Sequence, residues 1–512
     1  MANKAIKLYA KENGGRVSIL FLLFLLAIYE YYAMGVVGYA LVCLIPAMII
    51  GIILAYKHTG TFFWVIFTIN YFIMGIARYV NIPIQLSAIT LGPQLALLMV
   101  MIFNPNRTKG THYGTPMLIV LLIWTFYLFS QAFNDTCMLP FSMSDWLLNM
   151  TFYSFYFLLA YFMVTKLIRD PQRIMTFLRL WAFFSILAGI WAWKQKTFWF
   201  DEWEWRWLAA GAIRTHIIGG SIRYFSFFSD AANFGCCIAS SAVAFYISAI
   251  TTPLRKDKLL FLIAALFSTF GMFTSGTRSG IFCFLVGIAL YVFLSKSIKI
   301  AIPVIILGSL FVSFLAFTKI GDNNILIRRM RTAFNKDDAS LNVRDMNKKA
   351  LKKYLQDAPF GLGMNINEAT IPAFHKFRVV YETSNDSTYV FFWQRTGIVG
   401  VFFFAGMNII ILAGGCIITF FRLRSRICQG IGGAFCCAFL GINAGGYANH
   451  IMLQYPNIIL FYGGMAIVYL LPSIQDKFDV WEQELNKRKE ERKRIKLENK
   501  KKSRVKIYLN WI

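Results

Sequence analysis

Charged residues are scarce in this chain, and acidic residues are scarcer than basic ones. Asp, Glu, Lys and Arg make up 15% of its 512 residues, whereas 57% of the residues are hydrophobic. A soluble domain carries about 25% charged residues. The apolar residues instead form separate blocks of roughly 17–25 residues, a length at which a helix crosses about 30 Å of hydrocarbon. The composition therefore excludes a soluble globular protein and predicts an all-α polytopic membrane protein.

Disulfide and metal-ligand patterns are also missing. The nine cysteines form no CxxC pair, and most of them lie inside apolar blocks, where cysteine serves as a small apolar filler. The chain has no D-x-D motif of the kind that holds a metal in nucleotide-sugar enzymes. We therefore expect neither a bound metal nor a cofactor.

The apolar blocks predict about 14 transmembrane helices, with a range of about 12–14 because one block is long and another is rich in glycine. The blocks lie at 17–33, 35–55, 62–78, 84–103, 116–132, 146–165, 177–193, 231–251, 259–274, 280–294, 300–317, 387–418, 429–446 and 456–472. The segments between them alternate between basic ones and mostly short or neutral ones. Because lysine and arginine collect on the cytoplasmic side of membrane proteins, we expect both termini to be cytoplasmic.

The loops divide the chain into four regions. These are a cytoplasmic N-terminus at 1–16, N-terminal membrane helices at 17–193, a region with long external segments at 194–472, and a basic cytoplasmic tail at 473–512. The tail contains KRKEERKRIKLENKKK, which favours attraction to anionic lipid headgroups over nucleic-acid binding.

Two external segments are long. The first, at about 194–230, begins KQKTFWFDEWEWRW and predicts an interfacial helix whose rings lie at the headgroup level, with an aromatic wall facing lipid or sugar as the alternative. The second is one large periplasmic loop at about 319–386. Its residues 341–356 have apolar side chains at near-helical spacing, which predicts an amphipathic helix on the membrane or over a cavity.

Arginines lie at the external ends of several predicted spans. Arg214 and Arg223 precede the block at 231–251, with Arg223 in RYFSFFSDAANFG, and Arg278 lies in the short link SGTRSG at 275–280. A charge beside hydrocarbon is costly unless it snorkels or faces a polar cavity, and the arginine fork matches phosphate oxygens. We therefore expect a phosphate-bearing ligand at the outer membrane–water boundary. Asp230 is expected to cap the following helix.

With RYFSFFSDAANFG, SGTRSG and SNDSTYVFFWQRTGIVG (384–400) in that order, residues 205–470 resemble the O-antigen ligase and O-antigen polymerase superfamily of bacterial membrane glycosyltransferases. The resemblance implies an inverting, metal-independent enzyme of cell-surface polysaccharide biosynthesis, lipopolysaccharide included. Such an enzyme takes a glycan from a polyprenyl-pyrophosphate carrier, undecaprenyl pyrophosphate in bacteria, at the periplasmic face of the inner (cytoplasmic) membrane. The acceptor is left open between a glycolipid, a carrier-linked glycan and a protein hydroxyl.

The resemblance also implies roles for particular residues. Arg223 and Arg278 would hold the carrier pyrophosphate and stabilise the charge that develops on it as the sugar leaves. Where the family often carries a histidine before the span ending in GIVG, this chain has Asn385, Asp386 and Ser387. We take Asp386 as the candidate catalytic base, because a carboxylate can accept a proton from a hydroxyl. The predicted substrate-binding residues are Arg214, His216, Arg223, Ser275, Arg278 and Asn385, and the further histidine candidates for the base are His216, His375 and His450.

Two other functions stay open from the sequence. A lipid-linked glycan flippase or other transporter would also have many spans and arginines, although it should show internal repeats and charges along a path through the bilayer. The acidic trio of Asp201, Glu202 and Glu204 leaves room for a metal-dependent enzyme similar to oligosaccharyltransferases.

Overall fold

The computed structural model describes residues 51–80, 86–103, 115–323, 325–331, 339–365 and 371–509, apart from positions 54 and 219, together with a few residues between 22 and 29. The chain separates into two compact units, one of residues 1–68 and 81–109 and one of residues 69–80 and 110–512. The predicted spans at 17–33 and 35–55 lie almost wholly outside the described residues.

In the first unit, the described residues form the beginning of α3 (Thr59–Tyr79) and the whole of α4 (Leu86–Phe103). Phe63 and Phe67 stack one turn apart on α3 with their ring centroids 6.5 Å apart. Both helices lie in predicted apolar blocks, and the end of α3 continues into the second unit.

The second unit is a bundle of helices. Its longer helices are α5 (Pro116–Ser130), α6 (Met143–Met150), α7 (Tyr156–Leu167), α8 (Pro171–Phe198), α11 (Ala231–Thr251), α12 (Arg255–Thr274), α13 (Arg278–Leu294), α14 (Ile298–Phe317), α18 (Thr388–Ile417), α19 (Arg426–Ala448) and α20 (Gly463–Leu509). Shorter turns of helix join or extend them at η2 (Gln131–Phe133), η3 (Thr151–Phe155), η4 (Leu208–Ala212), η7 (Ile418–Arg422) and η8 (Ile458–Tyr462).

The predicted membrane helices agree with these elements. Each apolar block from 62–78 onward coincides with a helix. Within the described residues, nine helices are long and apolar enough to cross a membrane, and three shorter apolar helices lie at 89–103, 278–294 and 301–317. The helical polytopic membrane architecture is therefore confirmed, whereas the count of 14 spans stays a prediction.

Small residues explain why α11 and α19 form the centre of the bundle. Their sequences contain GCCIASSA and GIGGAFCCA, and 78% of the apolar window of each helix is buried inside the protein. Small side chains let helix backbones approach closely in a membrane, and α11 packs against α12, α13 and α19. The eight described cysteines are free and all but Cys416 are buried, as expected for apolar fillers.

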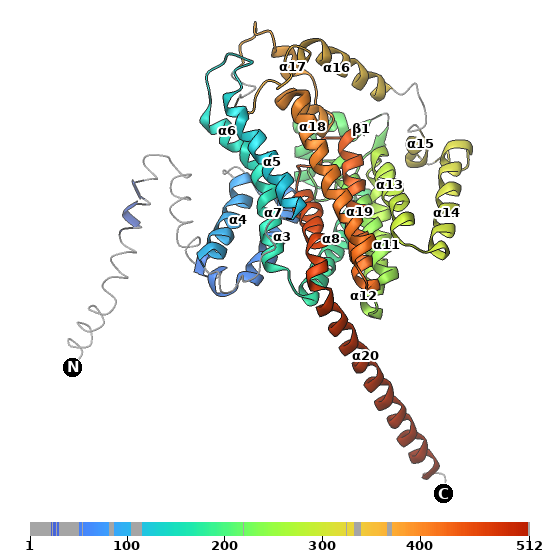
Figure 1. The fold of residues 1–512 in the computed structure, drawn as a ribbon. Helices are drawn as coiled ribbons and strands as arrows, with labels where there is room; N and C mark the ends of the chain where they lie inside the picture. The colour runs from blue at the N-terminus through green and yellow to red at the C-terminus, as the bar shows by residue number, and fades with distance from the viewer. Residues whose placement is uncertain are drawn as a thin grey trace, which may run out of the picture. The chain divides into compact units, whose positions relative to one another are not determined.

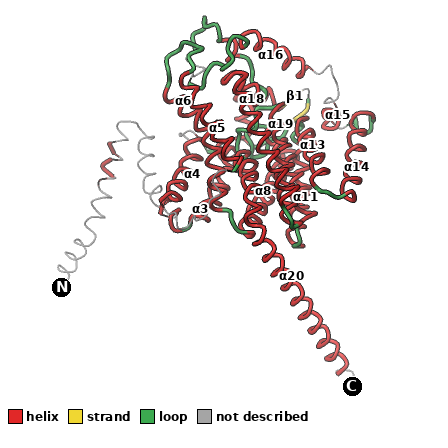
Figure 2. The backbone as a smooth tube through the Cα atoms, in the orientation of Figure 1, coloured by secondary structure: helices red, strands yellow, loops and turns green. Residues whose placement is uncertain are grey.

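The remaining elements gather at one end of the second unit, which we call the loop end. They are α9 (Glu202–Trp207), α10 (Ile213–His216), the hairpin of β1 (Ile217–Ile218) and β2 (Ser221–Ile222), α15 (Ile325–Arg331), α16 (Ala339–Leu355) and α17 (Arg378–Glu382). Helix α20 leaves the bundle from the opposite end (Figure 1). The backbone trace shows the same separation, with long loops beside α6 and α16 (Figure 2).

Helix α16 is the helix predicted at residues 341–356, and the apolar side chains of its second half pack against the protein. Leu351 and Leu355 are buried in a cluster with Leu362 of the following loop, whereas Val343 and Met346 are exposed. The apolar residues of α16 therefore face two directions.

The long block at 387–418 folds as one helix with a break at Gly397, whose φ of 68° and ψ of −175° are not helical. The break leaves backbone groups of α18 without partners inside the helix, and the loop at 359–363 forms hydrogen bonds with them. Leu362 N donates to the Gln394 carbonyl at 3.0 Å, Gly363 N donates to the Arg395 carbonyl at 2.9 Å, and Val399 N donates to the Pro359 carbonyl at 3.2 Å. Because buried backbone groups need partners, the break and the loop stabilise each other.

Candidate active site

The segment with Arg223 and the link with Arg278 meet at the loop end. Arg223 Nη2 donates to Thr277 Oγ1 at 2.9 Å, and Thr277 Oγ1 donates to the Ala231 carbonyl at 2.8 Å. Arg223 Nη1 donates to the Thr215 carbonyl at 2.9 Å. The guanidinium of Arg223 is therefore fixed beside the residue that directly precedes Arg278.

Gly235 permits this close meeting. A Cβ atom at position 235 would lie 2.3 Å from Ser275 Oγ and 2.8 Å from Thr277 Cβ. Any other residue would push the 275–280 link away from the first turns of α11. Glycine at this position thus sets the spacing between the two arginine-bearing segments.

Asn449 joins the third sequence motif to this pair. Its Nδ2 donates to Ser279 Oγ at 2.5 Å. Its carbonyl accepts from Thr388 N at 3.3 Å and from Thr388 Oγ1 at 3.2 Å. Thr388 is buried at the start of α18, so one residue after α19 connects SGTRSG with the motif at 384–400.

The predicted substrate-binding residues differ in how exposed their side chains are. Arg223 and Arg278 are partly buried, Asn385 is partly buried, and Arg214 is exposed on α10. Ser275 is fully buried, and its Oγ donates to the Met272 carbonyl at 2.8 Å. The structure therefore brings Arg223, Arg278 and Ser275 together, with the Ser275 hydroxyl turned into the protein.

His216 helps to build the start of α11. Its Nε2 accepts from Ala231 N at 3.1 Å, and its Nδ1 lies 2.9 Å from the Ala212 carbonyl. A neutral imidazole protonated at Nδ1 satisfies both contacts. Burial lowers the pKa of His216 to about 4, which keeps the ring neutral near pH 7. A substrate contact through His216 stays a prediction.

The cap predicted for Asp230 is confirmed. Its Oδ1 accepts from Ala232 N at 2.7 Å and from Asn233 N at 2.9 Å, the first free amides of α11. Because His216 accepts from Ala231 N, the first three amides of α11 all have acceptors. The start of α11 is therefore fixed shortly after Arg223 in the chain.

Asp386 lies just before α18, and its side chain is 44% exposed. Ser384 Oγ donates to Asp386 Oδ1 at 2.9 Å, and Arg344 Nε of α16 lies 4.0 Å from Asp386 Oδ2. On the same helix, Lys348 lies 5.0 Å from the centre of the Tyr447 ring near the end of α19. The large loop thus brings basic side chains to the ends of α18 and α19, next to the candidate base.

His450 is the second residue near these helix ends that can take a proton. Its Nδ1 is buried and has no hydrogen-bond partner among the described residues, and its ring lies edge-on to Phe391 at 4.7 Å. Burial lowers its pKa to about 4, and the Asp230 carboxylate opposes this shift. Gln454 links the two, because it donates to the His450 carbonyl at 2.7 Å and contacts Ser229, which donates to Asp230 at 3.0 Å.

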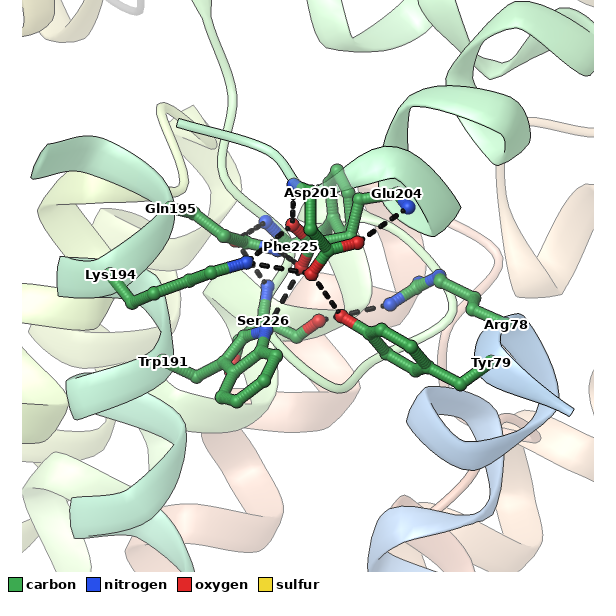
Figure 3. A network of polar contacts seen from close by, with 9 residues as sticks. All are labelled: Arg78, Tyr79, Trp191, Lys194, Gln195, Asp201, Glu204, Phe225 and Ser226. Carbon is green, nitrogen blue, oxygen red and sulfur yellow. Dashed lines mark hydrogen bonds and ion pairs between the residues drawn. The ribbon is translucent and has the colours of Figure 1, made fainter. Parts of the chain in front are cut away.

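The acidic trio does not face an open site. Lys194 Nζ lies 2.7 Å from Asp201 Oδ2 and 3.0 Å from Glu204 Oε2 (Figure 3). Tyr79 donates to Asp201 at 2.6 Å, and Glu204 is 1% exposed. Although burial acts to raise it, the hydrogen bonds from Lys194 and Tyr79 hold the pKa of Asp201 below its usual value.

These contacts weaken the metal-dependent alternative, because Asp201 and Glu204 already share a cation. The same two residues form the capping box that begins α9, and Glu202 instead pairs with Arg206 at 2.5 Å on the surface. Across the described ranges, no three His, Cys, Asp or Glu side chains are grouped so that they can hold a metal ion. In this first long external segment, helical structure begins with α9 at Glu202 and continues through η4 and α10 to His216.

Sequence reasoning missed the contribution of α3. Arg78 and Tyr79, at its end, contact the segments at 201–204 and 225–228 (Figure 3). The available signal was an arginine at the end of an apolar block, the same feature that identified Arg223 and Arg278.

The comparison with protein families agrees with the predicted resemblance. Residues 263–405 match the family described as O-antigen ligase. No curated protein matches the chain. The matched segment contains Arg278, Asp386 and the motif at 384–400, whereas Arg223 and His450 lie outside it. The chain is thus a helical membrane protein in which residues 263–405 are similar to the O-antigen ligase family.

Proposed function

We propose that the protein is a membrane glycosyltransferase that moves a glycan en bloc from a polyprenyl-pyrophosphate carrier to an acceptor. The observation that carries the proposal is the hydrogen bond from Arg223 to Thr277, which holds the Arg223 side chain against the residue directly before Arg278. Paired arginine forks suit the oxygens of a pyrophosphate.

The reaction needs little more than this arrangement. The acceptor hydroxyl oxygen attacks the anomeric carbon of the glycan, and the bond from that carbon to the pyrophosphate oxygen breaks with inversion. The bonding electrons leave with the pyrophosphate, whose growing negative charge Arg223 and Arg278 stabilise. A base takes the proton of the acceptor hydroxyl.

Two residues are candidates for that base. Asp386 is accessible at the start of α18, and Arg344 Nε lies 4.0 Å from its Oδ2. His450 has a ring nitrogen with no partner in the described part of the chain, and burial keeps the ring neutral. Asp386→Asn and His450→Gln separate them, because only loss of the base should reduce the turnover number strongly while donor binding is retained.

The charge distribution favours a periplasmic active site in the inner membrane. Lys477 of α20 lies 3.2 Å from Asp170, so the basic turn between α7 and α8 lies at the end from which α20 leaves. That turn and the tail are the kind of basic segments that stay cytoplasmic. The loop end would then face the periplasm, where carrier-linked glycans and their acceptors meet.

Transfer by the purified full-length protein in lipid nanodiscs tests the function. Carrier-linked glycan is supplied with a glycolipid, a second carrier-linked glycan or a protein acceptor in turn. We expect Arg223→Ala and Arg278→Ala to abolish transfer at normal expression, whereas Arg206→Ala, which removes an exposed ion pair, retains it. Wild-type transfer by both site variants would exclude the proposal.

The same preparation distinguishes the transporter. Protein in sealed liposomes that moves carrier-linked glycan across the bilayer without joining it to any acceptor would support a flippase. Transfer that persists in EDTA would support the metal-independent mechanism, and the anomeric configuration of the product reports inversion.

A further inference from the structure

The backbone that follows Arg223 has an uncommon conformation. Residues 225–228 belong to neither a helix nor a strand, and Ser226 has a φ of 51°. A residue other than glycine adopts this region rarely and keeps it only where its surroundings fix it. The contacts that fix Ser226 therefore decide the path of the chain between Arg223 and α11.

Every polar group of Ser226 is held by another part of the protein. Arg78 Nη1 donates to the Ser226 carbonyl at 2.9 Å (Figure 3). Arg78 Nη2 donates to the carbonyl of Phe228. Gln195 Oε1 accepts from Ser226 N at 3.0 Å, and Ser226 Oγ donates to the Ala188 carbonyl at 2.8 Å.

Arg78 makes these contacts from an aromatic enclosure. Its guanidinium lies 4.5 Å from the ring centre of Trp207 and 4.5 Å from that of Phe225. A planar fork that bonds two carbonyls and stacks on two rings cannot be reproduced by lysine, which presents a compact charge. The site is therefore built for arginine.

Arg223 is held from its other side as well. Arg223 N donates to the His216 carbonyl at 2.8 Å, and Tyr224 N donates to the Thr274 carbonyl at 3.3 Å. The clamp by Arg78 is the matching restraint after Arg223. Without Arg78, the carbonyls of Ser226 and Phe228 lose their donors, and Gln195 and the Ala188 carbonyl hold Ser226 alone, so the position of the Arg223 guanidinium becomes less fixed.

We propose that Arg78 is a positioning residue for Arg223, so that α3, which lies outside the O-antigen ligase match, forms part of the apparatus that binds the donor phosphate. This inference rests on the proposed function. Arg78 itself does not touch the substrate; it acts by holding the carbonyls of Ser226 and Phe228.

The test is binding of polyprenyl pyrophosphate alone to the full-length protein in nanodiscs. Arg78→Lys keeps the charge and the side-chain stem but loses the fork, and we expect its Kd to rise roughly 10-fold, the effect of losing a charge-assisted hydrogen bond. The matched control is Arg206→Lys, which changes a surface arginine of the same region and should leave Kd unchanged.

A double-variant cycle separates positioning from general support of the fold. In the Arg223→Ala background, Arg78→Lys should have no further effect on Kd, because Arg78 acts through Arg223. An equal fold-change in both backgrounds, or an unchanged Kd in Arg78→Lys alone, would overturn the inference. If the lysine variant does not fold, Trp207→Leu replaces it in the same cycle with a smaller expected rise.

Failure of the proposed function gives a different result. Wild-type protein that does not bind polyprenyl pyrophosphate would contradict the function before Arg78 is considered. Wild-type binding that Arg223→Ala weakens measurably and Arg78→Lys leaves intact would contradict the positioning role alone.

Discussion

Replacing Gly397 with alanine tests whether the break in α18 and the loop at 359–363 hold each other. The new Cβ would lie 2.0 Å from the Pro359 carbonyl oxygen and 2.3 Å from Gly361 N, at a φ of 68°. The strained backbone alone costs about 1–3 kcal/mol. Moving the loop away also loses three backbone hydrogen bonds of about 0.5–1.5 kcal/mol each, so the total loss of stability is about 2.5–7.5 kcal/mol.

Gly406→Ala is the matched control on the same helix. A Cβ at position 406 meets no atom within 4 Å, and its backbone is helical. Alanine favours helix over glycine by up to about 1 kcal/mol, so this variant should be as stable as the wild type or slightly more so.

The assay is thermal unfolding of the purified proteins in one detergent, followed by tryptophan fluorescence. We expect Gly397→Ala to unfold at a clearly lower temperature than Gly406→Ala, and its loop to be cleaved sooner by a protease. Equal midpoints for the two variants would refute the reasoning, because the break would then not depend on glycine.

Three further predictions follow from the site. Glu204→Ala removes the acceptor of the Trp191 and Gln195 side chains and should lower the free energy of unfolding by about 1–3 kcal/mol, whereas Glu202→Ala, on the surface, should cost almost nothing. Chemical denaturation compares the two variants. Gly235→Ala should push Thr277 away from α11 and lower the transfer rate at least about tenfold by displacing a group that must be aligned, while the unfolding midpoint changes little. The pKa of His216 falls from 6.5 to about 4 on folding, so between these pH values the unfolded protein binds a proton that the folded protein does not. The free energy of unfolding should therefore be highest above pH 6.5 and fall by about 3 kcal/mol as the pH falls toward 4. A His216→Gln variant with the same pH dependence of unfolding as the wild type would contradict this last prediction.

The membrane helices could be predicted from the sequence because their signal is local. A block of apolar residues is helical in a bilayer whatever it contacts, since its own backbone must satisfy every hydrogen bond. The cap at Asp230 is local for the same reason: an aspartate directly before an apolar run accepts from amides two and three residues later. The order of the three motifs carried the family resemblance, and that resemblance predicted that Arg223 and Arg278 belong to one site.

The contacts that assemble the site could not be predicted in this way. Arg78 lies 148 residues before Ser226, and Asn449 lies 170 residues after Ser279. Neither residue belongs to a pattern, because an arginine at a helix end and an asparagine after a helix are common. Their partners are set by the packing of α3 and α19, which the residue order does not reveal.

The sequence also could not predict in which direction a polar side chain points. Ser275 was chosen for its place beside Arg278, yet its hydroxyl bonds to its own turn. Asp201 and Glu204 were taken as external acidic groups, and the structure shows that both contact Lys194, the first residue of the same external segment.

The packing of the bundle has a consequence for how this domain can be exchanged between proteins. Within residues 263–405, α12 packs against α8 and α11, α13 packs against α11 and α19, and α18 packs against α5. Each of those partners lies outside the matched segment. A chimera that receives only this segment from a relative would have to fit foreign helices along all of these interfaces. The unit that sequence comparison identifies is therefore smaller than the unit that can be transplanted, and a functional graft would have to include α5, α8, α11 and α19 as well.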